Sequence, residues 1–179
     1  FFSIPVDHLN AIKVLEPHFK GWDLSNTVVV SPDLGNAKDA TRFARLLGVP
    51  VAAGTKQRVS DEKVIIDMIV GDVEGKNVII MDDEIATGGS IIELIKRLKE
   101  RHVKDIAVTC THGVFSGKSI ERFRAHPDIN EIVTTNTVPI PEEKMLPHMT
   151  VLSVAPLLAE AIRRIHNGES VSSLFIDTL

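Results

Sequence analysis

The sequence VIIMDDEIATGGS, residues 78–90, decides the fold of this chain. Its first four residues, Val78 to Met81, form an unbroken apolar run, which is typical of a strand buried on both faces of a parallel sheet. The sequence IIELIKRLKE follows Ser90 and has apolar residues at helical spacing. The glycine-rich segment between the two runs is therefore predicted to be a turn that leaves the carboxyl end of a strand and opens a helix.

This turn has the chemistry of a phosphate site. The backbone amides of a glycine-rich turn and the dipole of the following helix both favour a bound anion. Two side-chain hydroxyls in the turn add further hydrogen-bond donors. The residues predicted to hold the phosphate are Ala86, Thr87, Gly88, Gly89 and Ser90.

Two adjacent carboxylates, Asp82 and Asp83, precede the turn. Because carboxylates repel a phosphate, they are predicted to accept hydrogen bonds from sugar hydroxyls instead. The ligand would then carry hydroxyls at one end and a phosphate at the other, and ribose 5-phosphate has this layout. The alternative interpretation is a solvated acidic loop followed by an ordinary helix cap.

Composition predicts one globular domain over residues 1–179, since 44% of the residues are hydrophobic and 25% are charged. The net charge of −4 argues against nucleic acid as a partner. No apolar run approaches the length of a membrane span, so no membrane contact and a cytoplasmic location are expected. The single cysteine, Cys110, lies in an apolar run and is predicted to be an unreactive core thiol.

Apolar runs alternate with helical segments along the chain, which predicts an α/β fold: a mainly parallel, twisted sheet with helices on both faces. Helices are predicted at about residues 37–47, 90–101 and 119–125, and from about residue 155 to the Asn167-Gly168 stop signal. The polar segment GDVEGK, residues 71–76, is predicted to be a hairpin that adds an antiparallel strand. Ligands of such sheets bind beyond the carboxyl ends of the strands.

Three further segments carry candidate functional residues. Asp33, in SPDLGN, is predicted either to cap the following helix or to hold a divalent cation facing a phosphate. The polar segment 55–62 is predicted to be a mobile loop, in which Lys56 and Arg58 can clamp a transferring phosphoryl group. His112 follows another predicted strand and is either catalytic or a structural, substrate-packing residue.

Seven segments, in order and spacing, resemble the carboxyl-terminal half of the ribose-phosphate pyrophosphokinase family, and the resemblance covers nearly the whole chain. They are FFSIPVDHL, VVVSPDLGNAK, TKQR, VGDVEGKNVIIMDDEIATGGS, THGVFSG, TNTVPIP and NGESVSSLF. The resemblance implies a fold like that of the type I phosphoribosyltransferases. It also implies that the chain, which begins without methionine, is part of a polypeptide about twice as long and is inactive alone.

The resemblance implies roles for individual residues. Asp82 and Asp83 match the ligands of the ribose hydroxyls, and residues 86–90 match the 5-phosphate loop. Lys56 and Arg58 match the catalytic cations, and Asp33 matches a position near the metal and the pyrophosphate. Ser170 and Ser172 match a regulatory phosphate site.

The implied reaction transfers the β,γ-diphosphoryl group of ATP to the anomeric hydroxyl of ribose 5-phosphate, giving phosphoribosyl pyrophosphate and AMP. ATP is then the co-substrate and Mg²⁺ the cofactor, and the family assembles as dimers and hexamers, so a homo-oligomer is expected.

The chain also departs from the family pattern. Ala86 stands where the family usually has Asp, Asn36 where it commonly has Gly, and Asp39 where many members have a basic residue. Two alternatives from other classes therefore stay open. One is a non-catalytic, regulatory subunit associated with the synthetase, and the other is a type I phosphoribosyltransferase, for which no base-binding hood is evident.

Overall fold

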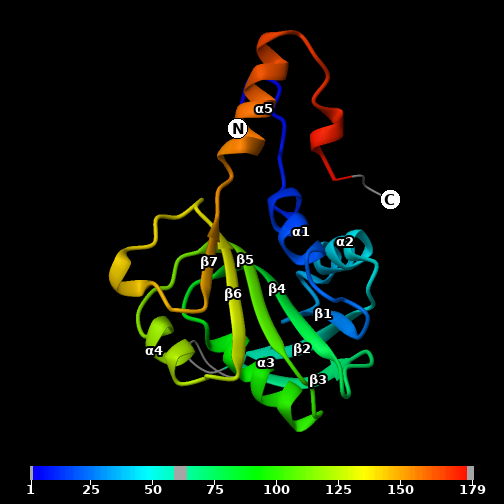
Figure 1. Ribbon diagram of the computed structural model, residues 1–179, viewed down its shortest axis with the longest axis vertical. Coiled ribbons are helices and arrows are strands. Elements are labelled where there is room, and N and C mark those ends of the chain that lie inside the picture. Colours follow the sequence, from blue (N-terminus) through cyan, green and yellow to red (C-terminus); the bar gives the residue numbers. More distant parts are fainter. Residues whose placement is uncertain (1, 59–63, 177–179) are drawn as a thin grey trace.

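The computed structural model describes residues 2–58 and 64–176 and contains a seven-stranded sheet with helices packed on it (Figure 1). The strands are β1 (Thr27–Ser31), β2 (Val51–Arg58), β3 (Val64–Val70), β4 (Asn77–Ile85), β5 (Ile106–Gly113), β6 (Ile129–Thr135) and β7 (Met149–Leu152). The helices are α1 (Ile12–Lys20), α2 (Ala37–Leu47), α3 (Gly89–Glu100), α4 (Ser119–Arg124) and α5 (Ala155–His166), with short 3₁₀ helices η1 (Glu142–Lys144) and η2 (Ser172–Leu174). The alternation predicted from the sequence is confirmed.

The strand order is β3-β2-β1-β4-β5-β6-β7, and every strand pair except β2–β3 is parallel. The chain passes from β1 outward to β2 and β3, and then returns to place β4 on the other side of β1. The direction of winding therefore changes between β1 and β4, where sheets of this kind bind ligands.

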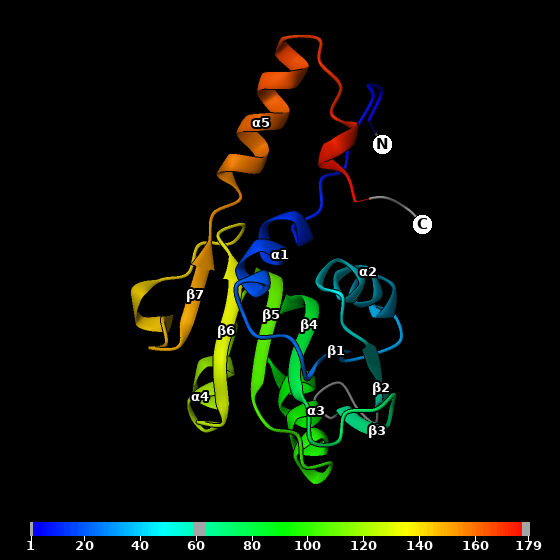
Figure 2. The same ribbon diagram turned by 45° about the vertical axis from the view of Figure 1, so that its right-hand side comes forward.

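Helices cover both faces of the sheet, as predicted (Figure 2). Successive residues of β1 point to opposite layers. Val28 and Val30 belong to the core cluster that includes α3 and α4, whereas Val29 belongs to the cluster that includes α1 and α2. Cys110 lies in the first of these cores, and burial raises the pKa of its thiol to about 12, which agrees with an unreactive thiol.

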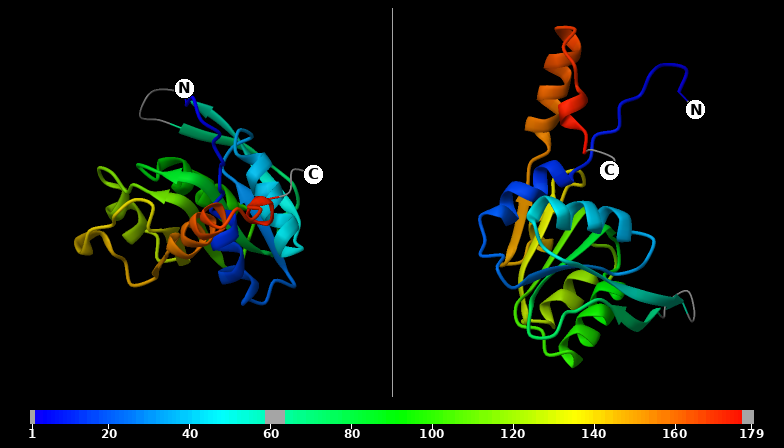
Figure 3. Two further views of the ribbon diagram at one scale, coloured as in Figure 1. Left: turned by 90° about the horizontal axis from the view of Figure 1, so that it is seen from above. Right: turned by 90° about the vertical axis from the view of Figure 1, so that its right-hand side faces the viewer.

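The predicted hairpin at residues 71–76 is wrong, although the antiparallel strand exists. β3 pairs with β2, with Lys56 opposite Ile66 and Arg58 opposite Val64, so the hairpin joins β2 to β3. The two strands form an arm at the edge of the sheet (teal in Figure 3). Residues 71–76 instead connect this edge to the central strand β4, and Val73 is buried on the way.

The last helix, α5, stands away from the sheet (Figures 1 and 2). Ala161 is its one buried residue, whereas Leu158, Ile162 and Ile165 are exposed. None of the helices within the described ranges combines the length and apolar character that a membrane crossing requires.

Candidate functional site

The carboxyl ends of β1 and β4 lie side by side, with Val30 paired to Ile80, so the loops that follow these strands meet. A hollow of about 270 Å³ lies between the loops. It is lined by Asp33 and by every residue from 82 to 91, and we call it the acid-loop hollow. The structure thus brings the predicted acid pair, the predicted phosphate turn and the predicted metal ligand to one place.

Asn36 connects the two loops. Its side-chain Nδ2 donates to the carbonyl of Met81 at 3.2 Å and to Asp82 Oδ1 at 3.4 Å, and its backbone N–H donates to Asp33 Oδ1 at 3.0 Å. Asp33 therefore fixes the turn that leads into α2, while Asn36 is the N-cap residue. The prediction that Asp33 caps α2 is therefore corrected: its carboxylate stabilises the turn that precedes the helix. In the sequence Asn36 is only a departure from the glycine common in the family, and no local pattern indicates this bridge.

The acid pair has unusual electrostatics. The pKa of Asp82 is raised to about 7, first by burial and then by the neighbouring carboxylates of Asp83 and Asp33. Near neutral pH this carboxyl therefore binds and releases a proton readily. A cation or a set of hydroxyl donors that entered the hollow would favour its charged form.

The raised pKa has a consequence for stability. The native state holds a proton on Asp82 between about pH 4 and pH 7, where the unfolded chain has released it, so the free energy of unfolding falls as pH rises through this range. The neutral variant Asp82→Asn lacks this dependence. It is expected to be more stable than the unmodified protein by a margin that widens from pH 4 to pH 7, up to about 4 kcal/mol.

Denaturant unfolding at pH 5 and pH 8 measures this margin. Asp72→Asn is the control, because the hydrogen bond and ion pair with Lys76 lower the pKa of Asp72, so this carboxyl is ionised in the native and unfolded states at both pH values and its replacement is expected to change stability equally at pH 5 and pH 8. A margin for Asp82→Asn that is equal at the two pH values would contradict the assigned burial effect.

The phosphate turn has a backbone conformation that requires glycine at one position. Gly88 has φ +72° and ψ 1°, and it is the N-cap residue of α3. A Cβ atom at Gly88 would lie 2.9 Å from Cε2 of Phe123, a fully buried ring of α4. Phe123 in turn packs edge-on against Phe115, with ring centroids 6.0 Å apart. The turn therefore rests on a rigid aromatic support.

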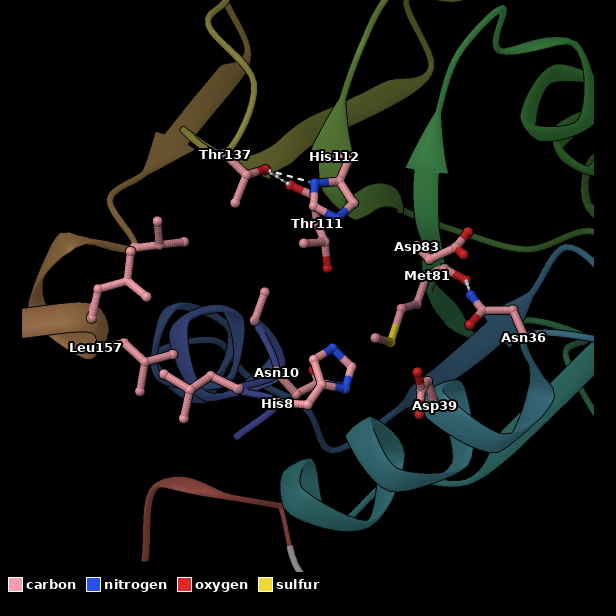
Figure 4. Close-up of a pocket in the computed structure, with 14 residues that line it drawn as sticks. His8, Asn10, Asn36, Asp39, Met81, Asp83, Thr111, His112, Thr137 and Leu157 are labelled. Atoms are coloured by element: carbon pink, nitrogen blue, oxygen red, sulfur yellow. Dashed lines mark hydrogen bonds between the residues drawn. The ribbon is translucent and has the colours of Figure 1, made fainter. Parts of the chain in front are cut away.

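A larger pocket of about 420 Å³ adjoins the acid pair (Figure 4). Asp83 lines both this pocket and the acid-loop hollow, and Asn36 and Asp39 lie beside it. Met81 and Leu157 give the pocket apolar walls. A molecule of mixed polar and apolar character placed there would lie next to a ligand in the acid-loop hollow.

His112 lies at the rim of the larger pocket, where its Nδ1 is 2.9 Å from Thr137 Oγ1 (Figure 4). Thr137 Oγ1 also donates to the carbonyl of Thr111 at 3.0 Å. One ring nitrogen of His112 is thus held by a structural hydrogen bond. The residue lines a pocket, as a substrate-packing histidine would.

The two predicted catalytic cations lie in strand β2. Residues 55–58 were predicted to be a loop, and this is wrong because their backbone pairs with β3. The side chains of Lys56 and Arg58 lie outside the part of the chain that the structure describes, as do residues 59–62, the rest of the predicted loop. The arm that carries the cations begins at Val51, which pairs with Val29 of β1.

The two predicted regulatory serines lie together after α5. Ser170 Oγ and Ser172 Oγ are 2.9 Å apart. Arg164 of α5 donates to the carbonyl of Ser170 at 3.1 Å and to Ser173 Oγ at 2.6 Å. The structure therefore places two hydroxyls and a guanidinium in one short segment.

Among residues 2–58 and 64–176, no cluster of three or more His, Cys, Asp or Glu side chains could hold a metal ion alone. Mg²⁺ commonly takes one or two protein carboxylates and completes its coordination with water and substrate phosphates. Asp33, at the wall of the acid-loop hollow, fits such a partial ligand.

Known proteins are similar to this chain over nearly its whole length. A Streptomyces coelicolor protein is 55% identical over 175 residues, which are 98% of this chain and 55% of that protein. The ribose-phosphate pyrophosphokinase of Deinococcus radiodurans is 46% identical over 180 residues, covering 98% of this chain and 56% of that enzyme. The chain therefore spans about half the length of the curated relatives it matches.

Solved structures support the same fold. The crystal structure of phosphoribosylpyrophosphate synthetase from Mycobacterium smegmatis matches with a TM-score of 0.83 and 41% identity, over 93% of this chain and 54% of that one. A purine phosphoribosyltransferase from Pyrococcus horikoshii matches with a TM-score of 0.52 and 19% identity, over 79% of this chain and 78% of that one. The predicted fold, like that of the phosphoribosyltransferases, is confirmed.

The family model described as "Phosphoribosyl synthetase-associated domain" matches residues 55–176. This range contains the acid pair, the phosphate turn, α4 and α5. Together with the relatives, the match confirms the resemblance seen in the sequence, and the chain belongs to the phosphoribosyl synthetase-associated domain family.

Proposed function

We propose that this chain provides the ribose 5-phosphate site of a ribose-phosphate pyrophosphokinase. The observation that carries the proposal is the acid-loop hollow, in which the acid pair Asp82 and Asp83 and the turn 86–90 line one cavity. The carboxylates would accept hydrogen bonds from the ribose hydroxyls, and the turn and the start of α3 would bind the 5-phosphate. Ala86 contributes through its backbone alone.

The proposed reaction moves a diphosphoryl group from ATP to the sugar. The anomeric oxygen of ribose 5-phosphate forms a bond to the β-phosphorus of ATP, the bond from that phosphorus to the α–β bridging oxygen breaks, and AMP leaves while the hydroxyl proton is released. Lys56 and Arg58 would neutralise charge on the moving group as it passes between the two oxygens. The acid pair would hold the sugar so that its anomeric hydroxyl faces the donor.

Mg²⁺, when bound, would supply charge neutralisation across the phosphates of ATP. Asp33 would contribute one carboxylate to it, and Asn36 would hold the Asp33 loop against the end of β4. We further propose that Ser170 and Ser172, with Arg164 beside them, bind a regulatory phosphate, and that the protein acts as a homo-oligomer.

Calorimetric titration of ribose 5-phosphate, with magnesium present, tests the proposal. The unmodified protein is expected to bind, and Asp82→Asn is expected to bind about tenfold more weakly, since it loses charge-assisted hydrogen bonds to the sugar. Asp105→Asn is the matched control, because Asp105 lies just before β5, at the amino ends of the parallel strands and so at the far end of the sheet from the hollow.

Saturable binding that weakens only in Asp82→Asn would support the sugar-phosphate site despite the alanine at position 86. Absence of binding by the unmodified protein would overturn the proposal and favour a non-catalytic, regulatory subunit.

A further inference from the structure

The phosphate turn is held from behind by hydrogen bonds to three successive carbonyls. The carbonyl of Ile85 accepts from the backbone N–H of Phe115 at 3.0 Å, and that of Ala86 accepts from the N–H of Ser116 at 2.9 Å. The carbonyl of Thr87 accepts from Nη1 of Arg122 at 2.6 Å. None of the three donor residues lines the acid-loop hollow, so all three approach the turn from its outer side.

The same hydrogen bonds determine the direction in which the backbone amides of the turn point. In a planar trans peptide, the carbonyl of one residue and the N–H of the next point in opposite directions. Carbonyls that are tied to donors outside the hollow therefore leave the N–H groups of residues 86, 87 and 88 directed away from those donors. A turn held in this way presents amides to an anion.

Arg122 differs from the other two donors because it is a charged side chain. It is exposed on α4, and its Nη1 would lie 3.9 Å from a Cβ atom at Gly89, which places the guanidinium close beneath the first residue of α3. Its own backbone carbonyl accepts from His126 Nδ1 at 2.8 Å, which helps to fix the end of α4. The guanidinium thus adds both a hydrogen bond and a positive charge to the phosphate turn.

We propose that Arg122 is a positioning residue for phosphate binding, which orients the Thr87–Gly88 peptide so that the Gly88 amide faces the hollow. This inference rests on the proposed function, since it assigns to Arg122 a share in the affinity for the 5-phosphate. Phe123, the next residue on α4, supports the same peptide from below by packing against Gly88. The helix therefore stabilises the turn by one polar and one apolar contact.

Calorimetry of ribose 5-phosphate binding to Arg122→Ala, Arg122→Lys and Arg124→Ala tests the proposal. Arg122→Ala is expected to lose about tenfold in affinity, and Arg122→Lys is expected to recover part of this loss because it keeps a charged donor. Arg124→Ala is the matched control, because Arg124 lies on the same helix and donates to the carbonyl of Glu143 instead. Thermal melting of each variant establishes that it is folded.

A second measurement follows the Gly88 amide by NMR. In the unmodified protein, added inorganic phosphate is expected to shift the NMR resonance of the Gly88 amide, and the shift is expected to shrink in Arg122→Ala and to persist in Arg124→Ala. A general loss of stability would not select this one resonance.

The outcomes separate the two proposals. If the unmodified protein binds ribose 5-phosphate and Arg122→Ala binds it equally well with an unchanged Gly88 shift, the role of Arg122 is overturned and the proposed function stands. If the unmodified protein binds neither ribose 5-phosphate nor inorganic phosphate, the proposed function falls, and the role of Arg122 falls with it.

Discussion

The Lys56→Ala variant is expected to turn over about a hundredfold more slowly than the unmodified enzyme, which corresponds to about 3 kcal/mol in the barrier. A cation that contacts the diphosphoryl group as it moves acts in the transition state, so its loss lowers turnover and leaves the affinity for ribose 5-phosphate almost unchanged. Turnover is measured with ATP, ribose 5-phosphate and magnesium in the full-length polypeptide.

Gln57→Ala is the matched control for this prediction. Gln57 is the uncharged residue between the two cations of β2 and pairs with Ile65 of β3, so its replacement disturbs the same arm without removing charge. Equal turnover in Lys56→Ala and Gln57→Ala would remove Lys56 from the proposed mechanism.

Gly88→Ala is expected to lower the free energy of unfolding by about 3 kcal/mol and to weaken ribose 5-phosphate binding more than tenfold. The left-handed conformation at φ +72° costs an alanine about 1–2 kcal/mol. The added methyl would also overlap the buried ring of Phe123, and such overpacking costs about 1–3 kcal/mol. Relief of the overlap moves the turn, and with it the amides that face the phosphate.

Gly89→Ala provides the comparison, since its Cβ would meet nothing closer than Thr87 Oγ1 at 3.8 Å. Its free energy of unfolding is expected to stay within about 1 kcal/mol of the original value. In a Phe123→Leu background the cost of Gly88→Ala should fall, because the ring that it strikes is gone. The test is denaturant unfolding of five proteins: the unmodified protein, Gly88→Ala, Gly89→Ala, Phe123→Leu and the double variant Gly88→Ala/Phe123→Leu. Equal costs for the two glycine replacements would refute the steric account.

Much of the fold could be predicted from the sequence because the strands of a parallel sheet have a distinctive local sequence pattern. Strands buried on both faces are unbroken apolar runs, as at Val78 to Met81, and α2 was predicted with its observed bounds, Ala37–Leu47. The candidate site was placed by the same pattern, because polar residues that follow such runs lie at the carboxyl ends of the strands, where sheets of this kind bind ligands.

What the sequence did not reveal depends on contacts between distant residues. The polar segment 71–76 looks locally like a hairpin, yet β3 packs on α3 and pairs with β2, which no short pattern encodes. Helix α1 was not predicted, and it contains Pro17, which normally argues against a helix interior. Arg122 stands 35 residues from Thr87, so its contact had no signal in the neighbourhood of the turn.

The pairing of β1 with β4 joins Thr27 to Asn77, and the intervening chain must close a long loop before the centre of the sheet can form. Closing such a loop costs conformational entropy, which the contacts between β1 and β4 must offset. A ligand that touches both the Asp33 loop and the turn after β4 would bridge the two strands and oppose their separation. Its binding would thus stabilise the folded chain in proportion to the logarithm of its concentration, and ligand supply in the cell would help to set how long the protein survives.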